Sequence, residues 1–288
     1  MAKISKAPSG FYTASQAMRR LGMNKGTFFN HAKAGKITKL IPPGGSEGYY
    51  KREEIDEMAQ AKELFLLQYS IAPKTFERAQ TEDDIRGIYD LCVAAFGISN
   101  TPSLEERLEE WKQFPNTYYV EKQENIVVGY ISLFYFTEEA LADLMTNRKK
   151  QTSLTVDVMK PLTPRETIDH LFISLAVRPG LTNEQQRRYG FKLLRDMIQV
   201  LENMAENNML VKKLYAVSRT SDGIKLARDM GMKETKFPND PTLRFELDLE
   251  KSETPLAQQY RNFIKNLKSN KPKEIANQTT IRYNDIKS

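Results

Sequence analysis

The stretch "IDHLFISLAVRPGLTNEQQRRYGFKLL", residues 168–194, decides the fold that we expect for most of the chain. Residues 168–177 form a nearly continuous apolar run, which is typical of a central strand buried on both faces. After a polar segment, apolar residues recur at helical spacing; they are Phe191, Leu194, Met197, Ile198, Leu201 and Met204. The stretch therefore predicts a buried strand that leads through a polar loop into a helix.

The start of that helix is a candidate site for an anion. A helix N-terminus presents unpaired amide groups and the positive end of the helix dipole, and both favour phosphate. The polar loop places glutamine, arginine and glycine residues there: Gln185, Gln186, Arg187, Arg188 and Gly190. We therefore expect a ligand that carries phosphate groups.

The flanking segments predict a mixed α/β domain over residues 75–250. Before the central stretch the sequence favours a short strand, two helices and a hairpin, with capping by Thr81, a capping box at Ser103 and Glu106, and a turn at Glu124-Asn125. The first of these helices places Cys92 at a core position. After the central stretch it favours a strand, a helix and a strand, namely residues 213–218, a helix that ends at Gly231, and residues 244–250.

These residues resemble the GNAT acetyltransferases over about residues 75–250. Residues 173–194 are similar to that family's signature strand, Leu-x-Val-x-Pro, and its pyrophosphate loop, Gln/Arg-x-x-Gly-x-Gly/Ala. The resemblance implies a bound acetyl-CoA or related acyl-CoA, whose pantetheine arm pairs with the backbone of Leu175 and Val177. It also implies that the loop holds the pyrophosphate through Gln185, Gln186, Arg187, Arg188, Tyr189 and Gly190.

Two positions depart from the GNAT pattern, and three residues are candidates for proton transfer. Arg188 stands where the loop has its middle glycine, and Ala227 stands where the family commonly has a tyrosine that acts as general acid. Acyl transfer mainly needs a positioned thioester, a deprotonated amine and a polarised carbonyl, so neither change abolishes it. The candidates are Asp169 and His170 before the signature strand and Ser218 after the next strand, although a histidine on an apolar strand is more often a hydrogen-bonded core residue.

The segment between residues 137 and 166 is longer than a typical connection of about 4–6 residues. We expect it to contain a helix, Glu138–Asn147, and an added strand around Leu154–Met159. In the GNAT arrangement such a segment lies near the acceptor side. It therefore shapes either an acceptor pocket or a dimer contact, and the sequence does not choose.

The N-terminal stretch "YTASQAMRRLGMNKGTFFNHAKAGKI", residues 12–37, predicts two short helices joined by a tight turn. Residues 36–55 then favour a strand, a glycine-rich turn, a second strand and a new helix, which together form a wing. The expected caps and stops are Thr13 or Ser15 and Gly22 for the first helix, and Asn24 and Gly35 for the second, Lys25–Lys33. This is the pattern of a helix-turn-helix unit.

Residues 11–60 resemble the winged helix-turn-helix of the MerR and excisionase families through Leu21-Gly22, Gly35-Lys36-Ile37 and Tyr49-Tyr50. The resemblance implies binding to double-stranded DNA, although small winged domains also serve protein contacts alone. Phosphates would be held by Arg19, Arg20, Lys39, Lys51 and Arg52. Base edges would face Lys25, Thr27, Asn30 and His31, with Lys33 exposed on the same helix.

A long helix is expected over residues 53–72, and it is a linker with two possible partners. It either pairs two subunits into a homodimer, through a seam that includes Leu66 and Tyr69, or packs on the chain's own second domain. After residue 250 one amphipathic helix is expected over residues 256–267. The remainder of the basic tail, residues 251–288, is expected to be disordered.

The charge is uneven along the chain. Its net value is +6, but residues 1–52 carry +9 and residues 251–288 carry +5, which leaves −8 for the remainder. Such a distribution favours a polyanion partner for the basic N-terminal end, although a basic surface that is merely solvated has the same distribution of charge. One cysteine and two distant histidines predict no disulfide framework and no metal site.

The absence of a long apolar run or a signal segment predicts a cytoplasmic protein without a membrane partner, associated with the nucleoid if it binds DNA. Three functions stay open. The first is a transcription regulator that binds acyl-CoA. The second is an active GNAT-type N-acetyltransferase that its winged domain docks near a substrate. The third is a mobile-element architectural protein that catalyses nothing.

Overall fold

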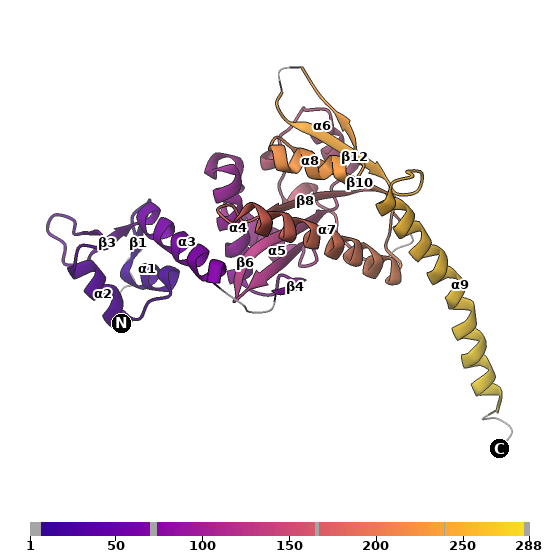
Figure 1. Ribbon diagram of the computed structural model, residues 1–288, viewed down its shortest axis with the longest axis horizontal. Coiled ribbons are helices and arrows are strands. Elements are labelled where there is room, and N and C mark those ends of the chain that lie inside the picture. The colour runs from indigo at the N-terminus through magenta and orange to yellow at the C-terminus, as the bar shows by residue number, and fades with distance from the viewer. Residues whose placement is uncertain (1–6, 70–73, 165–166, 239, 285–288) are drawn as a thin grey trace. The chain divides into compact units, whose positions relative to one another are not determined.

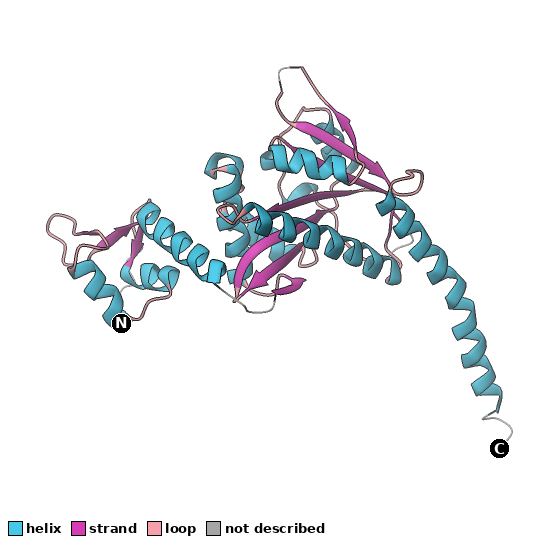
Figure 2. Ribbon diagram, viewed as in Figure 1, coloured by secondary structure: helices cyan, strands magenta, loops and turns pink. Residues whose placement is uncertain are grey.

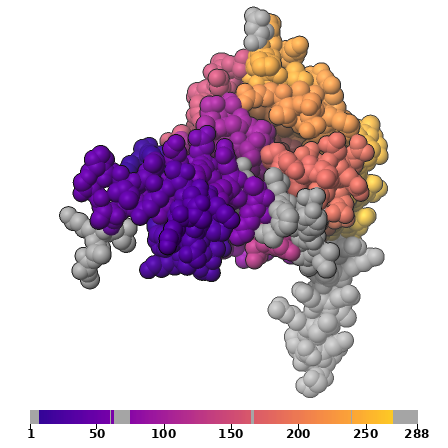
Figure 3. Space-filling view, turned by 60° about the vertical axis from the view of Figure 1, so that its left-hand side comes forward, coloured from indigo at the N-terminus to yellow at the C-terminus, as the bar shows by residue number. Residues whose placement is uncertain are grey.

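The computed structural model describes residues 7–69, 74–164, 167–238 and 240–284, without the side chains of residues 60, 63–69, 74 and 270–284. The chain divides into two compact units, Met1–Ala72 and Pro73–Ser288. Figures 1 and 2 show the elements of each unit, and Figure 3 marks in grey the residues whose placement is not described.

The first unit is a small antiparallel sheet packed against three helices. Its strands lie in the order β1 (Phe11–Thr13), β3 (Tyr49–Lys51) and β2 (Lys39–Leu40), and its helices are α1 (Ala14–Leu21), α2 (Lys25–Lys33) and α3 (Arg52–Tyr69). The buried side chains come from every helix, from β3 and from the segment between α2 and β2; they are Ala17, Leu21, Phe28, Ile37, Tyr50, Ile55 and Ala59. One apolar core therefore holds the two short helices against the hairpin.

The turn between α1 and α2 forms as the sequence predicts. Thr13 makes a capping box with Gln16 at the start of α1, and Gly22 ends that helix in the left-handed region at φ +58°. The Asn24 side chain caps α2 by accepting from the amide of Thr27 at 2.9 Å. Gly35 follows α2 at φ +72°, so all of these expected caps and stops are confirmed, with Thr13 as the first cap.

The second unit is built on a seven-stranded mixed sheet in the order β11-β12-β10-β8-β6-β5-β4. The strands are β4 (Lys74–Arg78), β5 (Tyr118–Gln123), β6 (Ile126–Phe134), β8 (Leu171–Val177), β10 (Lys213–Ser218), β11 (Lys233–Thr235) and β12 (Leu243–Asp248). A separate parallel pair joins β7 (Thr167–Ile168) and β9 (Leu210–Val211). The predicted central strand is thus in the middle of the sheet.

Helices cover both faces of this sheet (Figure 1). One apolar core contains residues of α7 (Asn183–Glu206), α8 (Ser221–Asp229) and α9 (Pro255–Asn284). The other contains residues of α4 (Glu82–Phe96) and α6 (Glu138–Met145), with α5 (Leu104–Gln113) packed against it. Neighbouring residues of β8 divide between the cores, with Ile173 in the first and Phe172 in the second, as the alternation of side chains along a strand requires. Cys92 is buried in the second core, as expected.

β8 and β10 are paired at only one end. β8 is antiparallel to β6 along its length, from Phe172 opposite Phe134 to Val177 opposite Gly129. Its parallel pairing with β10 involves only Leu171 and Phe172, and the two strands then diverge. Residues 174–177 are accordingly half-buried. The expectation of burial along the whole strand is therefore wrong, because the second half lacks a neighbour on one side.

Three local expectations also need correction. The helix after β8 begins at Asn183, so residues 185–190 form its first turns and are not a loop. Phe191 is 60% exposed, because the buried stripe of α7 runs through Tyr189 and Leu193 instead. Residues 154–159 are not a strand: they contain the short 3-10 helix η3 (Val156–Val158), and only a single bridge joins Met159 to Phe136. The 3-10 helices η1 (Ile98–Asn100) and η2 (Gln151–Ser153) complete the unit.

The C-terminal region also differs from expectation. α9 begins at Pro255 and continues to Asn284, although the sequence favoured a helix that ends near residue 267 and a disordered tail. Among the side chains of α9 that the structure describes, the buried ones lie in its first turns; they are Leu256, Ala257 and Tyr260. Residues 285–288 lie outside the described part of the chain.

Candidate functional site

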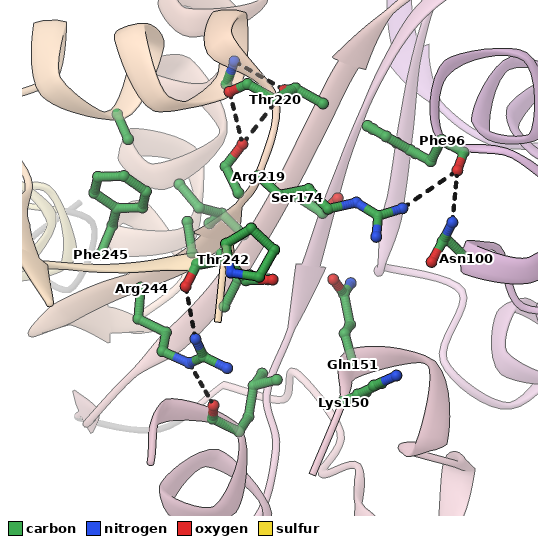
Figure 4. A pocket seen from close by; sticks show the side chains of 18 of the residues that line it. Phe96, Asn100, Lys150, Gln151, Ser174, Arg219, Thr220, Thr242, Arg244 and Phe245 are labelled. Atoms are coloured by element: carbon green, nitrogen blue, oxygen red, sulfur yellow. Dashed lines mark hydrogen bonds between the residues drawn. The ribbon is translucent and has the colours of Figure 1, made fainter. Parts of the chain in front are cut away.

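A cleft of about 370 Å³ opens where β8 and β10 diverge (Figure 4). Its walls are the facing edges of the two strands, with Ile173, Ser174 and Leu175 on one side and Ala216, Val217 and Ser218 on the other. The end of α6 at Leu144, residues 147–152 after it and the start of α8 close its ends. The segment between residues 137 and 166 therefore contributes to the cleft.

The β8 wall of the cleft carries backbone groups that the sheet does not pair. Among the described residues, β8 has no ladder partner on the β10 side beyond Phe172. Alternate residues of a strand direct their amide and carbonyl groups to opposite neighbours, so part of residues 174–177 presents such groups to the cleft. An unpaired strand edge inside a cleft can bind an extended ligand that contains amides.

Cations predominate in the lining of the cleft. It contains Lys149, Lys150, Arg219 and Arg244, against one acid, Asp240. Arg244 is paired with Asp240 at 2.5 Å and Lys149 with Asp143 at 3.2 Å. Figure 4 shows Arg219 beside Phe96, where its guanidinium donates to the Phe96 carbonyl at 3.5 Å. In the part of the chain that is described, no acid pairs with Lys150 or Arg219, so the lining favours an anionic ligand.

Of the residues that the sequence singled out, Leu175, Ser218 and Ala227 line the cleft. The Ser218 hydroxyl lies 3.4 Å from the Thr220 hydroxyl at the entry to α8. Ala227 is buried, and it has no hydroxyl at the position where the GNAT pattern has its general-acid tyrosine. Val177 continues the same strand beyond Leu175, where it pairs with Gly129.

Asp169 and His170 precede β8 and do not line the cleft. The exposed Asp169 carboxylate accepts from Lys212 at 2.9 Å, and this hydrogen bond lowers its pKa. His170 is buried, with Nε2 3.0 Å from the Phe136 carbonyl. Burial lowers the pKa of its imidazole. The structure thus places these two side chains apart from Ser218.

The start of α7 is closed by its own cap. The Thr182 hydroxyl accepts from the Gln185 amide at 3.2 Å, and the Thr182 carbonyl accepts from the Gln186 amide at 2.9 Å. Amides beyond the first turn of a helix donate within the helix. Residues 187–190 therefore do not offer the free amides of an open loop. Among the other predicted ligands, Gln185, Gln186 and Gly190 are half-buried, Tyr189 is buried, and the side chains of Arg187 and Arg188 are exposed.

A buried polar cluster beneath the cleft was not found from the sequence. Arg107 and Glu110 of α5 lie with Tyr130 and Ser132 of β6 around a small cavity. Both α5 residues are more than nine-tenths buried. Helical spacing was the signal in the sequence that could have revealed this cluster. Arg107 falls on the same face as Leu104, Leu108 and Trp111 of α5, which pack against the core.

In the first unit, most of the predicted DNA-binding side chains are exposed. They are Lys25, Thr27, Asn30 and Lys33 on α2, Arg19 at the end of α1, and Lys39, Lys51 and Arg52 on the hairpin and at the start of α3. The Arg52 guanidinium lies 5.0 Å from the centre of the Tyr12 ring. His31 is half-buried, and its Nδ1 has no hydrogen-bond partner among the described residues. Arg20 differs, because its Nε donates to Asp56 at 2.9 Å and its side chain is only 10% exposed.

The described residues contain no group of histidine, cysteine and acidic side chains that could hold a metal ion. Within the same residues, no helix has the length and apolar character that crossing a membrane requires. The side chains of Leu66 and Tyr69, on which the expected dimer seam depends, lie outside the description.

Comparison with known proteins finds similar folds among acetyltransferases. No family model matches the sequence, and no curated protein matches it. An N-acetyltransferase from Staphylococcus aureus Mu50 is 15% identical, with a TM-score of 0.39, over 62% of this chain and 99% of that chain. The loading GNATL domain of CurA from Lyngbya majuscula is 15% identical, with a TM-score of 0.45, over 62% of this chain and 100% of that chain. The ribosomal-protein-S18-alanine N-acetyltransferase of Escherichia coli is 15% identical, with a TM-score of 0.38, over 61% of this chain and 94% of that chain.

Proposed function

We propose that the second unit is a GNAT-type domain that binds acyl-CoA between β8 and β10, and that the first unit is a MerR-like winged helix-turn-helix that binds DNA. The divergence of β8 and β10 is the observation that carries the first part. It leaves a strand edge with unpaired backbone groups inside a cleft. The signature Leu175-x-Val177-x-Pro179 lies on and directly after that edge.

The chemistry of acyl-CoA fits this cleft. The pantetheine arm is an extended chain with amide groups, which can bond to residues 174–177 as an added strand would. The cationic lining suits the phosphates of CoA or a carboxylate on the acyl or acceptor group. At the start of α7, the exposed side chains of Arg187 and Arg188 replace the loop amides as the groups that contact the diphosphate.

Acyl transfer needs few groups from the protein. A neutral amine attacks the thioester carbon, the new C–N bond forms as the C–S bond breaks, and the leaving sulfur takes a proton. Ser218 is the candidate closest to this chemistry, because it lies in the cleft and Asp169 and His170 do not line it. Its hydroxyl can donate to the leaving sulfur or orient a water molecule.

Calorimetry with CoA and acetyl-CoA tests the acyl-CoA proposal. We expect binding heat and a higher melting temperature, since a ligand that binds only the folded state stabilises it. Arg188→Ala should weaken binding about fivefold, which corresponds to roughly 1 kcal/mol for an exposed charge contact. The matched control is Arg195→Ala, which removes another exposed arginine of α7 and should leave the affinity unchanged. A wild-type chain with neither binding heat nor thermal protection would remove acyl-CoA from its function.

The DNA proposal rests on the exposed face of α2. Lys25, Asn30 and Lys33 are exposed there, while Phe28 anchors the helix in the core. A helix fixed in this way after a tight turn presents one side to a groove. Residues 1–52 contain one acid, Glu47, so few charges oppose a phosphate backbone.

Release of CoA from acetyl-CoA separates the three functions left open by the sequence. An acetyltransferase docked on DNA releases CoA when an acceptor amine is supplied. A regulator binds acyl-CoA and DNA without release, and an architectural protein binds no acyl-CoA. We prefer the regulator, because neither Arg188 nor Ala227 follows the GNAT pattern.

A further inference from the structure

A cavity of about 20 Å³ lies directly behind the wall of the cleft. Ser174 and Gln151 line both the cleft and this cavity, and Figure 4 shows both side chains from the cleft side. The remaining polar lining comes from Arg107, Glu110, Tyr130 and Ser132. The cavity is therefore a polar space that one shared wall separates from the proposed acyl-CoA site.

Two buried polar atoms of this lining have no hydrogen-bond partner within the described structure: Nε of Arg107 and the hydroxyl of Ser132. Arg107 is 6% exposed and Ser132 is 1% exposed. A buried polar group without a partner costs roughly 1–3 kcal/mol. A cavity of about 10–15 Å³ or more with several polar neighbours is large enough for one water molecule. The lining thus fits a single water molecule that satisfies both atoms.

Polar contacts lie on both sides of this cavity, which Tyr130 and Glu110 both line. The Tyr130 hydroxyl lies 3.1 Å from the Ser174 hydroxyl, and Tyr130 itself lines the cavity. On the far side, Glu110 accepts a hydrogen bond from Tyr118. The Arg107 guanidinium donates to Tyr118 and to Cys92, both at 3.4 Å. Every one of these groups except Ser174 is buried.

We propose that Ser174, Tyr130 and one buried water molecule form a proton relay that carries a proton from an acceptor ammonium in the cleft to the Glu110 carboxylate. This inference rests on the acetyltransferase among the proposed functions, the one in which CoA is released. The ammonium gives one proton to the relay and Glu110 receives one, which leaves a neutral amine to attack the thioester carbon. After the C–S bond breaks, the sulfur takes the second amine proton. Glu110 returns its proton to solvent through the same relay.

The surroundings of Glu110 determine the direction of the pH effect. It faces Arg107 and Tyr118, Tyr130 lines the same cavity, and Glu106 and Glu109 belong to its own helix. Burial raises the pKa of the Glu110 carboxyl, while the Tyr118 hydrogen bond and Arg107 oppose this change. The rate of acyl transfer should therefore fall as the pH decreases through this raised pKa, because the protonated carboxyl accepts no further proton.

Glu110→Gln and Tyr130→Phe test the relay in the full chain, with Glu109→Gln as the matched control at an exposed position of the same helix. The assay follows CoA release from acetyl-CoA with an amino acid, a diamine and a lysine peptide across the pH range. We expect each relay variant to lower kcat at least tenfold and to move the acid-side decline to higher pH, towards the pKa of the acceptor ammonium, with an unchanged Kd for CoA. Tyr130→Phe removes only a hydroxyl, so it keeps the test valid if Glu110→Gln unfolds.

Two results would overturn the relay. If both relay variants fold and keep the wild-type pH profile, the relay is wrong while acyl transfer stands. If the wild-type chain binds CoA but transfers no acetyl group to any of these amines, the relay fails together with the enzymatic part of the proposed function. Glu109→Gln should match the wild type in every measurement.

Discussion

Arg19 and Arg20 are neighbours in the chain but have different environments. Arg20 donates to Asp56 of α3 and is largely buried, whereas Arg19 is exposed at the end of α1. An arginine engaged with a carboxylate reaches a DNA phosphate only by breaking that pair. Of these two arginines, we therefore propose that Arg19, and not Arg20, contacts a DNA phosphate. The sequence around Arg19 and Arg20 does not distinguish their roles, because Asp56 is 36 positions away from Arg20.

The two arginines give opposite predictions. Arg19→Ala should flatten the dependence of log affinity for DNA on log salt by roughly 0.9, the value for one lost phosphate contact, with no change in melting temperature. Arg20→Ala should leave the slope unchanged and lower the free energy of unfolding by roughly 1–2 kcal/mol. Binding titrations at several salt concentrations and urea unfolding measure these effects. A flatter slope for Arg20→Ala with unchanged stability would show that the assignment is reversed.

At the scale of elements, the ends of most helices could be predicted because their signals are local. Thr81, Ser103 and Asn24 each cap the helix that follows them, and a cap depends on residues only three or four positions apart. The start of α7 was missed although Thr182 and Gln185 have the spacing of a capping box. The resemblance to the GNAT pyrophosphate loop had instead assigned Gln185 to phosphate binding.

The cleft could be predicted only in part, because strand divergence is not a local property. The sequence identifies β8 and β10 and places Leu175 and Ser218 on them. The point at which the two strands separate depends on pairing between Leu171 and Leu214, far apart in the chain. The same holds for Arg107 and Ser132, whose burial depends on how α5 and β6 meet.

Arg244 connects the start of β12 to the end of α6, and Asp240 neutralises it. The Arg244 guanidinium donates to the Leu144 carbonyl at 3.2 Å and to Asn147 at 2.5 Å, besides its pair with Asp240. The backbone amide of Thr242 and the Arg244 side chain lower the pKa of the Asp240 carboxyl. This stabilisation is therefore present above about pH 4, the ordinary value for aspartate, and is lost as the pH falls through the lowered pKa.

Asp240→Asn should accordingly lower the free energy of unfolding at pH 7 by about 2 kcal/mol, because it leaves a buried guanidinium without its anion. The difference from the wild type should shrink as the pH decreases towards 3. Urea unfolding at both pH values measures this effect. Asp157→Asn, at an exposed position, serves as the control. An equal loss of stability at both pH values would show that charge is not the cause.

At the scale of the whole molecule, the proposed functions belong to different units. The basic residues 1–52 belong to the first unit, and the cleft and the polar cluster belong to the second. One chain with two binding units acts as a regulator only if occupancy of one unit changes the affinity of the other. That coupling is a free energy between sites and must be reciprocal.

The regulator therefore predicts one coupling factor measured in two ways. Saturating acetyl-CoA should change the affinity for DNA by about 5–150-fold, the range that allosteric coupling usually spans, and saturating DNA should change the affinity for acetyl-CoA by the same factor. Fluorescence anisotropy with labelled DNA and calorimetry with acetyl-CoA measure the two directions at one salt concentration. A factor of one together with CoA release favours an acetyltransferase that DNA merely localises. A factor of one without CoA release contradicts both functions, because a regulator requires coupling between the two sites and an acetyltransferase must release CoA.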